Sequence, residues 1–148
     1  MRTATTNQAM LVAGLTEVAL GAATGWPFAL AIADPDRARA LGLRSTARLR
    51  QWHLDLIALG GLTVLAATAV PDIPRGVAIP LTVGAWTNAN AFGVLVFRPE
   101  AHAHPAYRAG VAASFVATTW GFAGLALTAV GSRRPARRRR PGRRRRRG

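Results

Sequence analysis

Four long apolar segments alternate along this chain with short stretches rich in proline and charge. The apolar segments cover residues 9–33, 52–70, 77–97 and 109–130. Each is close to the roughly 20 residues that an α-helix needs to cross the hydrocarbon core of a bilayer. Glu17 and Asp55 are the acidic residues inside them. The pattern predicts four transmembrane helices, because a small soluble domain could not cover four such apolar surfaces.

The intervening stretches contain the residues that end helices. They cover 34–51, 71–76 and 98–108, and Pro71, Pro74 and Pro105 stand where helices should stop. The apolar segments lack the two-residue alternation of a porin-like barrel. We therefore expect an all-α fold: an integral membrane four-helix bundle over residues 1–131, followed by a disordered arginine-rich C-terminal tail over 132–148.

The first apolar segment has a second interpretation, as a cleaved signal peptide. Ala31-Ile32-Ala33 resembles a cleavage site. However, the apolar run is longer than the core of an ordinary signal peptide, and it contains Glu17. We therefore expect it to remain as a membrane span.

Positive charge is concentrated in the tail. Residues 133–148 contain 11 of the 20 arginines and no acid, whereas residues 1–132 contain nine arginines and six acids, a net charge of only +3. The like-charge runs 137–140 and 143–147 cannot bury a core and should be disordered. One interpretation is contact with anionic lipid, at about 1 kcal/mol per arginine. Another is a topology anchor; nucleic-acid binding is disfavoured because no aromatic residue is present to stack on bases.

The arginine distribution gives two answers for orientation. Four spans place both termini on the same side, and the total count of arginines places that side in the cytoplasm. The first connection alone, with five arginines, favours the reverse. We expect a cytoplasmic tail, because moving so many arginines outward against the membrane potential is costly. The Ala, Gly and Arg richness suggests a bacterial genome, hence a bacterial inner membrane.

Several classes of site are excluded by composition or by missing motifs. The chain has no cysteine, which excludes disulfides, thiolate catalysis and zinc-cysteine sites. It has no nucleotide-binding fingerprint, no nucleophile elbow and no H-E-x-x-H. His102-Ala103-His104 could bind a metal as a pair, although such a pair in a loop is usually solvated.

Polar side chains inside the predicted spans are the candidate functional residues, because they are costly in lipid. Glu17 is either a proton relay or ligand, or a protonated or hydrogen-bonded packing residue. His53 and Asp55 begin the second span, and a separation of two residues turns them about 200° apart, so they cannot share one ligand. His53 could ligate a metal or haem iron, or it could lie at the membrane interface beside Trp52.

The third span contains the stretch Trp86-Thr87-Asn88-Ala89-Asn90. Two asparagines in an apolar span need hydrogen-bond partners. Because the second and third spans run antiparallel, Asn90 should lie at a depth similar to that of Asp55. The asparagines could join Asp55 or His53 in a polar cluster, or they could only bond neighbouring helices.

Glycines indicate where helices approach closely. Gly21 and Gly25 form a G-x-x-x-G pattern, and Gly60-Gly61, Gly121 and Gly124 add small surfaces in other spans. Together they favour tight helix packing.

Two short stretches are similar to those of a family of small bacterial membrane enzymes. His53-Leu54-Asp55, with Gly60 seven residues after the histidine, is similar to the His-Leu-Glu pattern of hydroxylaminobenzene mutase. Ala85-Trp86-Thr87-Asn88 is similar to Gly-Trp-Ser-Asn of styrene oxide isomerase. With the layout of spans over about 10–130, the chain resembles the four-helix family that contains these two enzymes.

The resemblance implies a homotrimer with haem b between subunits and His53 as the iron ligand. In the isomerase the ferric iron acts as a Lewis acid on an epoxide oxygen, and a hydride shift gives the aldehyde. Asp55, Asn88 and Asn90 would be further residues of the catalytic pocket. The chain departs from the family at Leu59, where both enzymes have Asn, and at Gly84 and Phe92, where the isomerase has an acid and a Tyr.

Since these positions orient substrate in the isomerase, three functions stay open. The first is a haem-dependent isomerase or mutase that acts on a small hydrophobic substrate. The second is a non-catalytic bundle that binds haem, quinone or a lipid-like molecule. The third is a structural or partner subunit, in which the polar residues only set helix packing.

Overall fold

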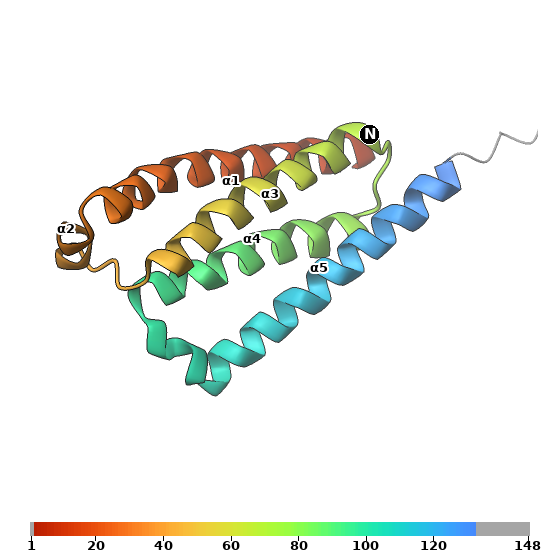
Figure 1. Cartoon of the computed structure of the whole chain (residues 1–148). Coiled ribbons are helices and arrows are strands. Elements are labelled where there is room, and N and C mark those ends of the chain that lie inside the picture. Colours follow the sequence, from red (N-terminus) through yellow and green to blue (C-terminus); the bar gives the residue numbers. More distant parts are fainter. Residues whose placement is uncertain (1, 133–148) are drawn as a thin grey trace, which may run out of the picture.

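The computed structural model describes residues 2–132, with side chains from 5 to 131, so residues 133–148 of the tail predicted over 132–148 lie outside the described residues. The described part is helical and contains no strand, which confirms the all-α prediction. Its elements are α1 (Arg2–Ala33), α2 (Pro35–Ala40), α3 (Thr46–Ala69), α4 (Arg75–Phe97), the 3-10 helix η1 (Pro99–Ala103) and α5 (Pro105–Ser132) (Figure 1).

The long helices extend beyond the predicted apolar runs because their first turns are polar. Helix α3 begins at Thr46, where the Oγ of Ser45 accepts a hydrogen bond from the Arg48 N–H at 3.3 Å and caps the helix. Helix α5 begins at Pro105, since proline is well tolerated at the first helical position, where its missing N–H would have no partner. Hydropathy alone does not reveal such turns.

The first connection contains a short helix that was not predicted. Asp34 caps α2 by accepting a hydrogen bond from the Arg37 N–H at 3.0 Å. Ala38 of α2 is buried in an apolar cluster with Leu49 and Val96. This cluster closes one end of the space between α1, α3 and α4.

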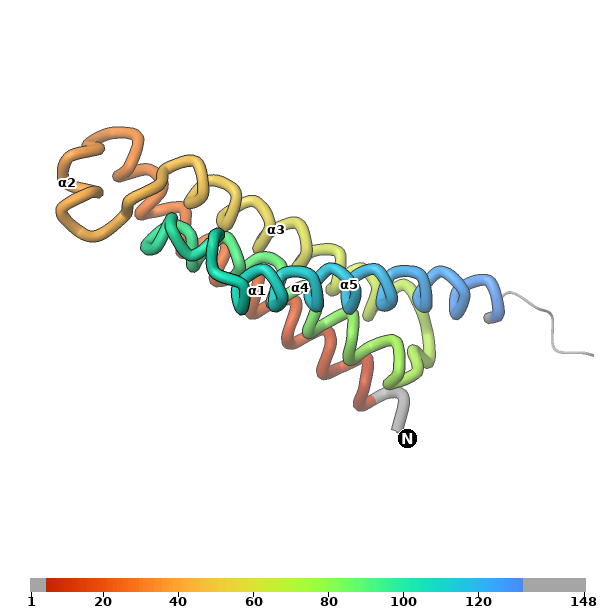
Figure 2. Tube along the Cα trace, turned by 90° about the horizontal axis from the view of Figure 1, so that it is seen from below, coloured from red at the N-terminus to blue at the C-terminus, as the bar shows by residue number. Residues whose placement is uncertain are grey.

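Helices α1, α3 and α4 pack around a common core, whereas α5 packs mainly on α4 (Figure 1). Leu56, Leu81, Ala85 and Ala89 are fully buried in that core. Figure 2 shows that α5 crosses α4 and ends away from the start of α1. The four long helices therefore form a three-helix unit with α5 attached along one side.

Within the described residues, three helices are long and apolar enough to cross a membrane: Thr5–Ala33, Thr46–Ala69 and Pro105–Gly131. They agree with the first, second and fourth predicted spans. Helix α4 has 23 residues but is not among these three helices. The third span over 77–97, and with it the four-span bundle, stays a prediction.

Large apolar side chains cover much of the outer surface. Trp26 is 82% exposed, Leu127 is 74% exposed and Val116 is 69% exposed. Soluble monomers rarely expose apolar patches larger than a few hundred Å². Together with the three apolar helices, this surface indicates a membrane protein.

Candidate functional site

Glycines bring the backbones of α1 and α3 together. A Cβ added to Gly14 would lie 2.8 Å from the main-chain oxygen of Gly60, and one added to Gly21 would lie 2.7 Å from Cγ1 of Ile57. Gly25 faces the ring of His53, whose Cε1 would be 3.5 Å from an added Cβ. The close contact predicted for Gly21 and Gly25 is confirmed, and it places His53 directly against α1.

The hydrogen bonds of His53 determine which ring nitrogen is open. Its Nδ1 lies 2.8 Å from the carbonyl oxygen of Gly21 and 3.2 Å from Oγ1 of Thr24. The Thr24 hydroxyl donates to the same carbonyl at 2.6 Å. Because a carbonyl oxygen can only accept, Nδ1 carries the proton and donates it. In the neutral imidazole Nε2 then holds the lone pair, and no hydrogen bond to it occurs within the described residues.

Aromatic packing also fixes the plane of the His53 ring. Phe28 of α1 stacks on the imidazole, with ring centroids 5.9 Å apart and planes inclined by 30°. The side chain of His53 is half-buried. A histidine whose Nδ1–H is bound to a main-chain carbonyl and whose Nε2 is free has the arrangement found in metal- and haem-ligating histidines.

Asp55 lies apart from His53 on the same helix. Its carboxylate accepts a hydrogen bond at 2.9 Å from Nε2 of Gln51, one turn earlier on α3. The angle of about 200° between positions 53 and 55 turns the two side chains to different neighbours. Asp55 therefore does not share a ligand site with His53, as the spacing predicted.

Asn88 and Asn90 point to different sides of α4. Asn90 accepts a hydrogen bond from Nε1 of Trp52 at 3.2 Å, and it donates to the carbonyl of Trp86 at 2.8 Å. Asn88 lines a groove between α4 and α5. Among the side chains the structure describes, no hydrogen bond joins His53 or Asp55 to either asparagine. The geometry thus favours the interpretation in which Asn90 bonds a neighbouring helix.

Glu17 is fully buried between the three core helices, with no exposed surface. Its Cβ would lie 3.0 Å from a Cβ added to Gly60, so it faces α3 at the closest approach. Both of its carboxyl oxygens, and Oγ1 of Thr82, are buried without a hydrogen-bond partner in the described part of the chain. A hydrogen-bonded packing role is therefore not supported, and an unpaired polar group in this position costs stability.

The loop histidines are solvent-exposed. Nδ1 of His102 lies 2.6 Å from the Pro99 carbonyl oxygen, and Nδ1 of His104 accepts a hydrogen bond from the Ala106 N–H at 3.3 Å. Over residues 5–131 no three His, Cys, Asp or Glu side chains are placed to hold a metal ion together. Over the same residues, His53 is therefore not part of a metal site built from three such side chains.

Two hydrogen-bonded contacts were not predicted from the sequence. Asn7 donates to the carbonyls of Ala67 at 3.0 Å and Val70 at 2.8 Å, and its oxygen accepts from the Ile73 N–H at 3.3 Å. The second contact is the Trp52–Asn90 bond between α3 and α4. In each case the polar residue was visible in the sequence, but its partner lies 38 or more residues away.

Comparison with known proteins finds no matching family model, no similar curated protein and no similar solved structure. The function is therefore inferred from the geometry of the chain itself.

Proposed function

We propose that this chain is a membrane protein that binds haem through Nε2 of His53 and acts as an isomerase or mutase on a small hydrophobic substrate. The supporting observation is the contact of His53 Nδ1 with the Gly21 carbonyl on α1, which leaves Nε2 without a hydrogen bond among the described residues. One imidazole ligand is sufficient for a haem iron. Bound haem would supply a Lewis-acidic iron, as the resemblance to the isomerase and mutase family implies.

The residues around His53 fit this role. The Gly21 carbonyl binds the Nδ1–H, which orients the ring and makes Nε2 a stronger ligand. Phe28 packs on the imidazole and limits its rotation. Leu54 and Ile57, neighbours of His53 on α3, are 48% and 39% exposed and provide apolar surface beside the ring. A flat apolar group, or a second copy of the chain as in the family's trimer, could pack there.

A second candidate is a bundle that binds haem but does not catalyse, and it has its own support. Asp55, Asn88 and Asn90 do not converge on His53, so the proposed pocket residues are separated. A Cβ on Gly84 would lie 2.6 Å from the main-chain nitrogen of Thr118, so the acid found here in the isomerase would not fit. Catalysis would then need a different set of residues.

The first test is the visible absorption spectrum of the protein purified in mild detergent, before and after haem is added. We expect a Soret band in the wild type that is lost in His53→Ala. His102→Ala and His104→Ala are matched controls, because both histidines are exposed in the same chain, and both variants should keep the band. A colourless wild type after haem addition would exclude this proposal and favour the structural subunit.

Turnover separates the two haem-binding candidates. The haem-loaded wild type and His53→Ala are incubated with a small aromatic epoxide and with an aryl hydroxylamine. Rearranged product from the wild type alone supports the isomerase or mutase. A Soret band that depends on His53, together with no product from either compound, supports the non-catalytic bundle.

A further inference from the structure

A groove of about 360 Å³ lies between α4 and α5, away from the α1–α3 contact that holds His53. Its wall includes Asn88 and Phe92 of α4, and Tyr107, Arg108, Val111 and Phe115 of α5. The Tyr107 hydroxyl donates a hydrogen bond to the Ala91 carbonyl at 2.9 Å, which fixes the start of α5 against α4. The groove thus has a polar mouth and an apolar interior.

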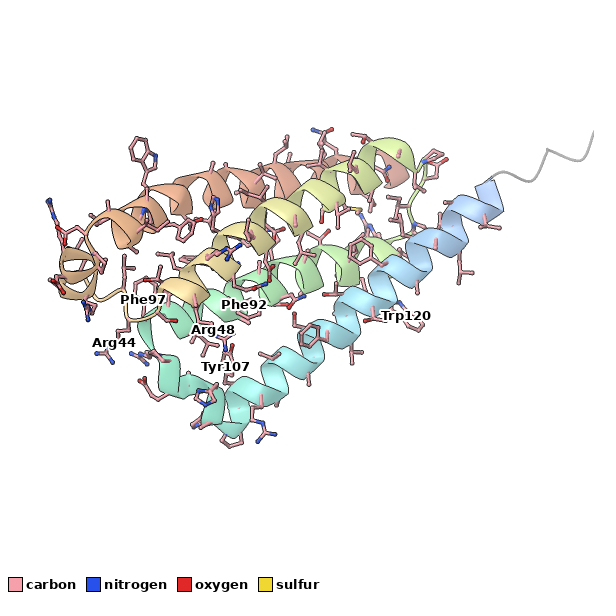
Figure 3. All side chains as sticks on the ribbon, in the orientation of Figure 1. Arg44, Arg48, Phe92, Phe97, Tyr107 and Trp120 are labelled. Atoms are coloured by element: carbon pink, nitrogen blue, oxygen red, sulfur yellow. The ribbon has the colours of Figure 1, made fainter. Side chains whose placement is uncertain are left out.

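Two arginines lie at the mouth, one from each side. Arg108 of α5 lines the groove, and the guanidinium of Arg48 on α3 lies 5.7 Å from the centre of the Phe92 ring. Figure 3 shows Arg48 and Tyr107 approaching each other in the space between α3 and α5. The cation over Phe92 therefore faces the mouth of the groove.

Neither Arg48 nor Arg108 forms an ion pair with an acidic side chain within residues 5–131. The ion pair found in the described part of the chain joins Arg39 and Asp36, which are exposed on α2. Asp55 lies two turns beyond Arg48 on α3, and it is hydrogen-bonded to Gln51. A positively charged mouth without a carboxylate attracts an anion.

The apolar interior continues along α5 from the mouth. Phe115 also lines the next hollow, together with Val116 and Trp120. From Arg108 to Trp120 an α-helix rises about 18 Å. That distance is slightly more than half of the roughly 30 Å hydrocarbon core, which is the depth that one acyl chain reaches. Charge and shape together match an anionic amphiphile that enters from one leaflet.

We propose that this groove binds one anionic phospholipid, with its phosphate between Arg48 and Arg108 and an acyl chain against Phe115 and Trp120. Both arginines lie near the first turns of their helices, where a lipid phosphate would lie. Guanidinium groups bind phosphate oxygens through charge-assisted hydrogen bonds. The site is separate from His53 and does not depend on haem.

The test is native mass spectrometry of the full chain from mild detergent, titrated with phosphatidylglycerol, with phosphatidylcholine and with inorganic phosphate. We expect the wild type to prefer phosphatidylglycerol to phosphatidylcholine. The double variant Arg48→Gln/Arg108→Gln should weaken phosphatidylglycerol binding about 30-fold, since each arginine near a membrane surface contributes about a fivefold preference. The matched control Arg50→Gln/Arg98→Gln removes the same charge from the same end and should change binding less than about threefold.

Ala112→Phe tests the acyl chain independently of charge. Ala112 lines the groove and is exposed, so a phenyl ring there fills the groove without crowding the core. This variant should lose phosphatidylglycerol binding and keep any binding of inorganic phosphate. Equal losses in the two arginine pairs would show a diffuse surface charge, and unchanged lipid binding in Ala112→Phe would show a phosphate site alone; either result overturns the proposal. A Soret band that persists in Arg48→Gln/Arg108→Gln would show that the haem site is unaffected.

Discussion

The α1–α3 and α4–α5 contacts both bring two helix backbones together at glycines. They differ in whether their polar side chains are hydrogen-bonded. Both place glycine against a neighbouring backbone: Gly14 against Gly60 in the first, and Gly121 against Leu81 in the second. Across α4–α5 the hydroxyls are paired, since Thr87 donates to Ser114 at 2.8 Å and Ser114 donates to the Gly84 carbonyl at 3.2 Å.

At the α1–α3 contact, by contrast, two groups have hydrogen-bonding capacity that no described residue uses. The carboxyl of Glu17 is buried without a partner, and Nε2 of His53 is open. Membrane helices that only need to associate satisfy their polar groups. The polar side chains that hydrogen-bond across α4–α5 are therefore satisfied, whereas α1–α3 has a buried carboxyl without a partner in the described residues and, under the proposed function, the haem ligand.

The largest effect is expected from Gly121→Ala, which breaks the α4–α5 contact. Its added Cβ would lie 2.5 Å from the Cα of Leu81, so the two backbones would have to separate. We expect a loss of about 3 kcal/mol in the free energy of unfolding, at the upper end of overpacking costs. Unfolding in mixed micelles measures this loss. Gly110→Ala is the control, because no atom lies within 4 Å of its added Cβ, and an equal loss there would contradict the explanation.

The next largest effect is a gain in stability, and it concerns the unpartnered carboxyl at the α1–α3 contact. Glu17→Met replaces the unpartnered carboxyl with an apolar side chain of similar length. We expect the free energy of unfolding to rise by about 1–3 kcal/mol, because a buried polar group without a hydrogen bond carries a penalty of that size. Thermal unfolding in detergent tests it. A less stable Glu17→Met would mean that the carboxyl has a partner in the assembled protein.

A smaller effect is expected where the two helix pairs meet, at α3–α4. Asn90→Leu removes the acceptor for Trp52, and the cost should be about 0.6 kcal/mol, the average for hydrogen bonds between membrane helices, and no more than the maximum of about 1.7 kcal/mol. A double-mutant cycle with Trp52→Phe isolates this bond. If the two losses add fully, the bond contributes nothing and the prediction is wrong.

The smallest effect is expected at Thr24. Thr24→Val removes the hydroxyl 3.2 Å from Nδ1 of His53 and leaves the Gly21 carbonyl in place as the main acceptor. Stability should change by less than about 1 kcal/mol, the value of an ordinary hydrogen bond. Under the proposed function, the Soret band should keep its intensity. Loss of the band in Thr24→Val would show that the hydroxyl, and not the carbonyl, holds the ring.

Helical content, the apolar runs and the glycine contacts could be predicted from local sequence. Apolar length predicted the three described helices that are long and apolar enough to span a membrane, and Gly21 and Gly25 indicated the face of α1 that meets α3. The polar partners could not be predicted in this way. Whether Asn90 meets Asp55 or Trp52 depends on the rotation of α3 about its axis, and a difference of about 100° per residue changes the partner.

The arrangement of α5 was also beyond sequence reasoning. A four-helix pattern is equally compatible with a closed bundle and with a helix packed on one neighbour. The choice depends on which faces carry small residues, and Gly84, Gly121 and Gly124 all lie on the α4–α5 contact. The glycines could be read from the sequence, but the helix that each of them contacts could not.

The contact of Asn7 with the end of α3 has a consequence for the order in which the protein is made. Asn7 binds two carbonyls and one N–H around the α3–α4 turn, 60 to 66 residues later in the chain. Because the N-terminal part is synthesised first, α1 is complete before this turn emerges from the ribosome. The position of Asn7 on α1 then sets the axial register of α3 against α1, because the end of α3 can bind only where Asn7 lies.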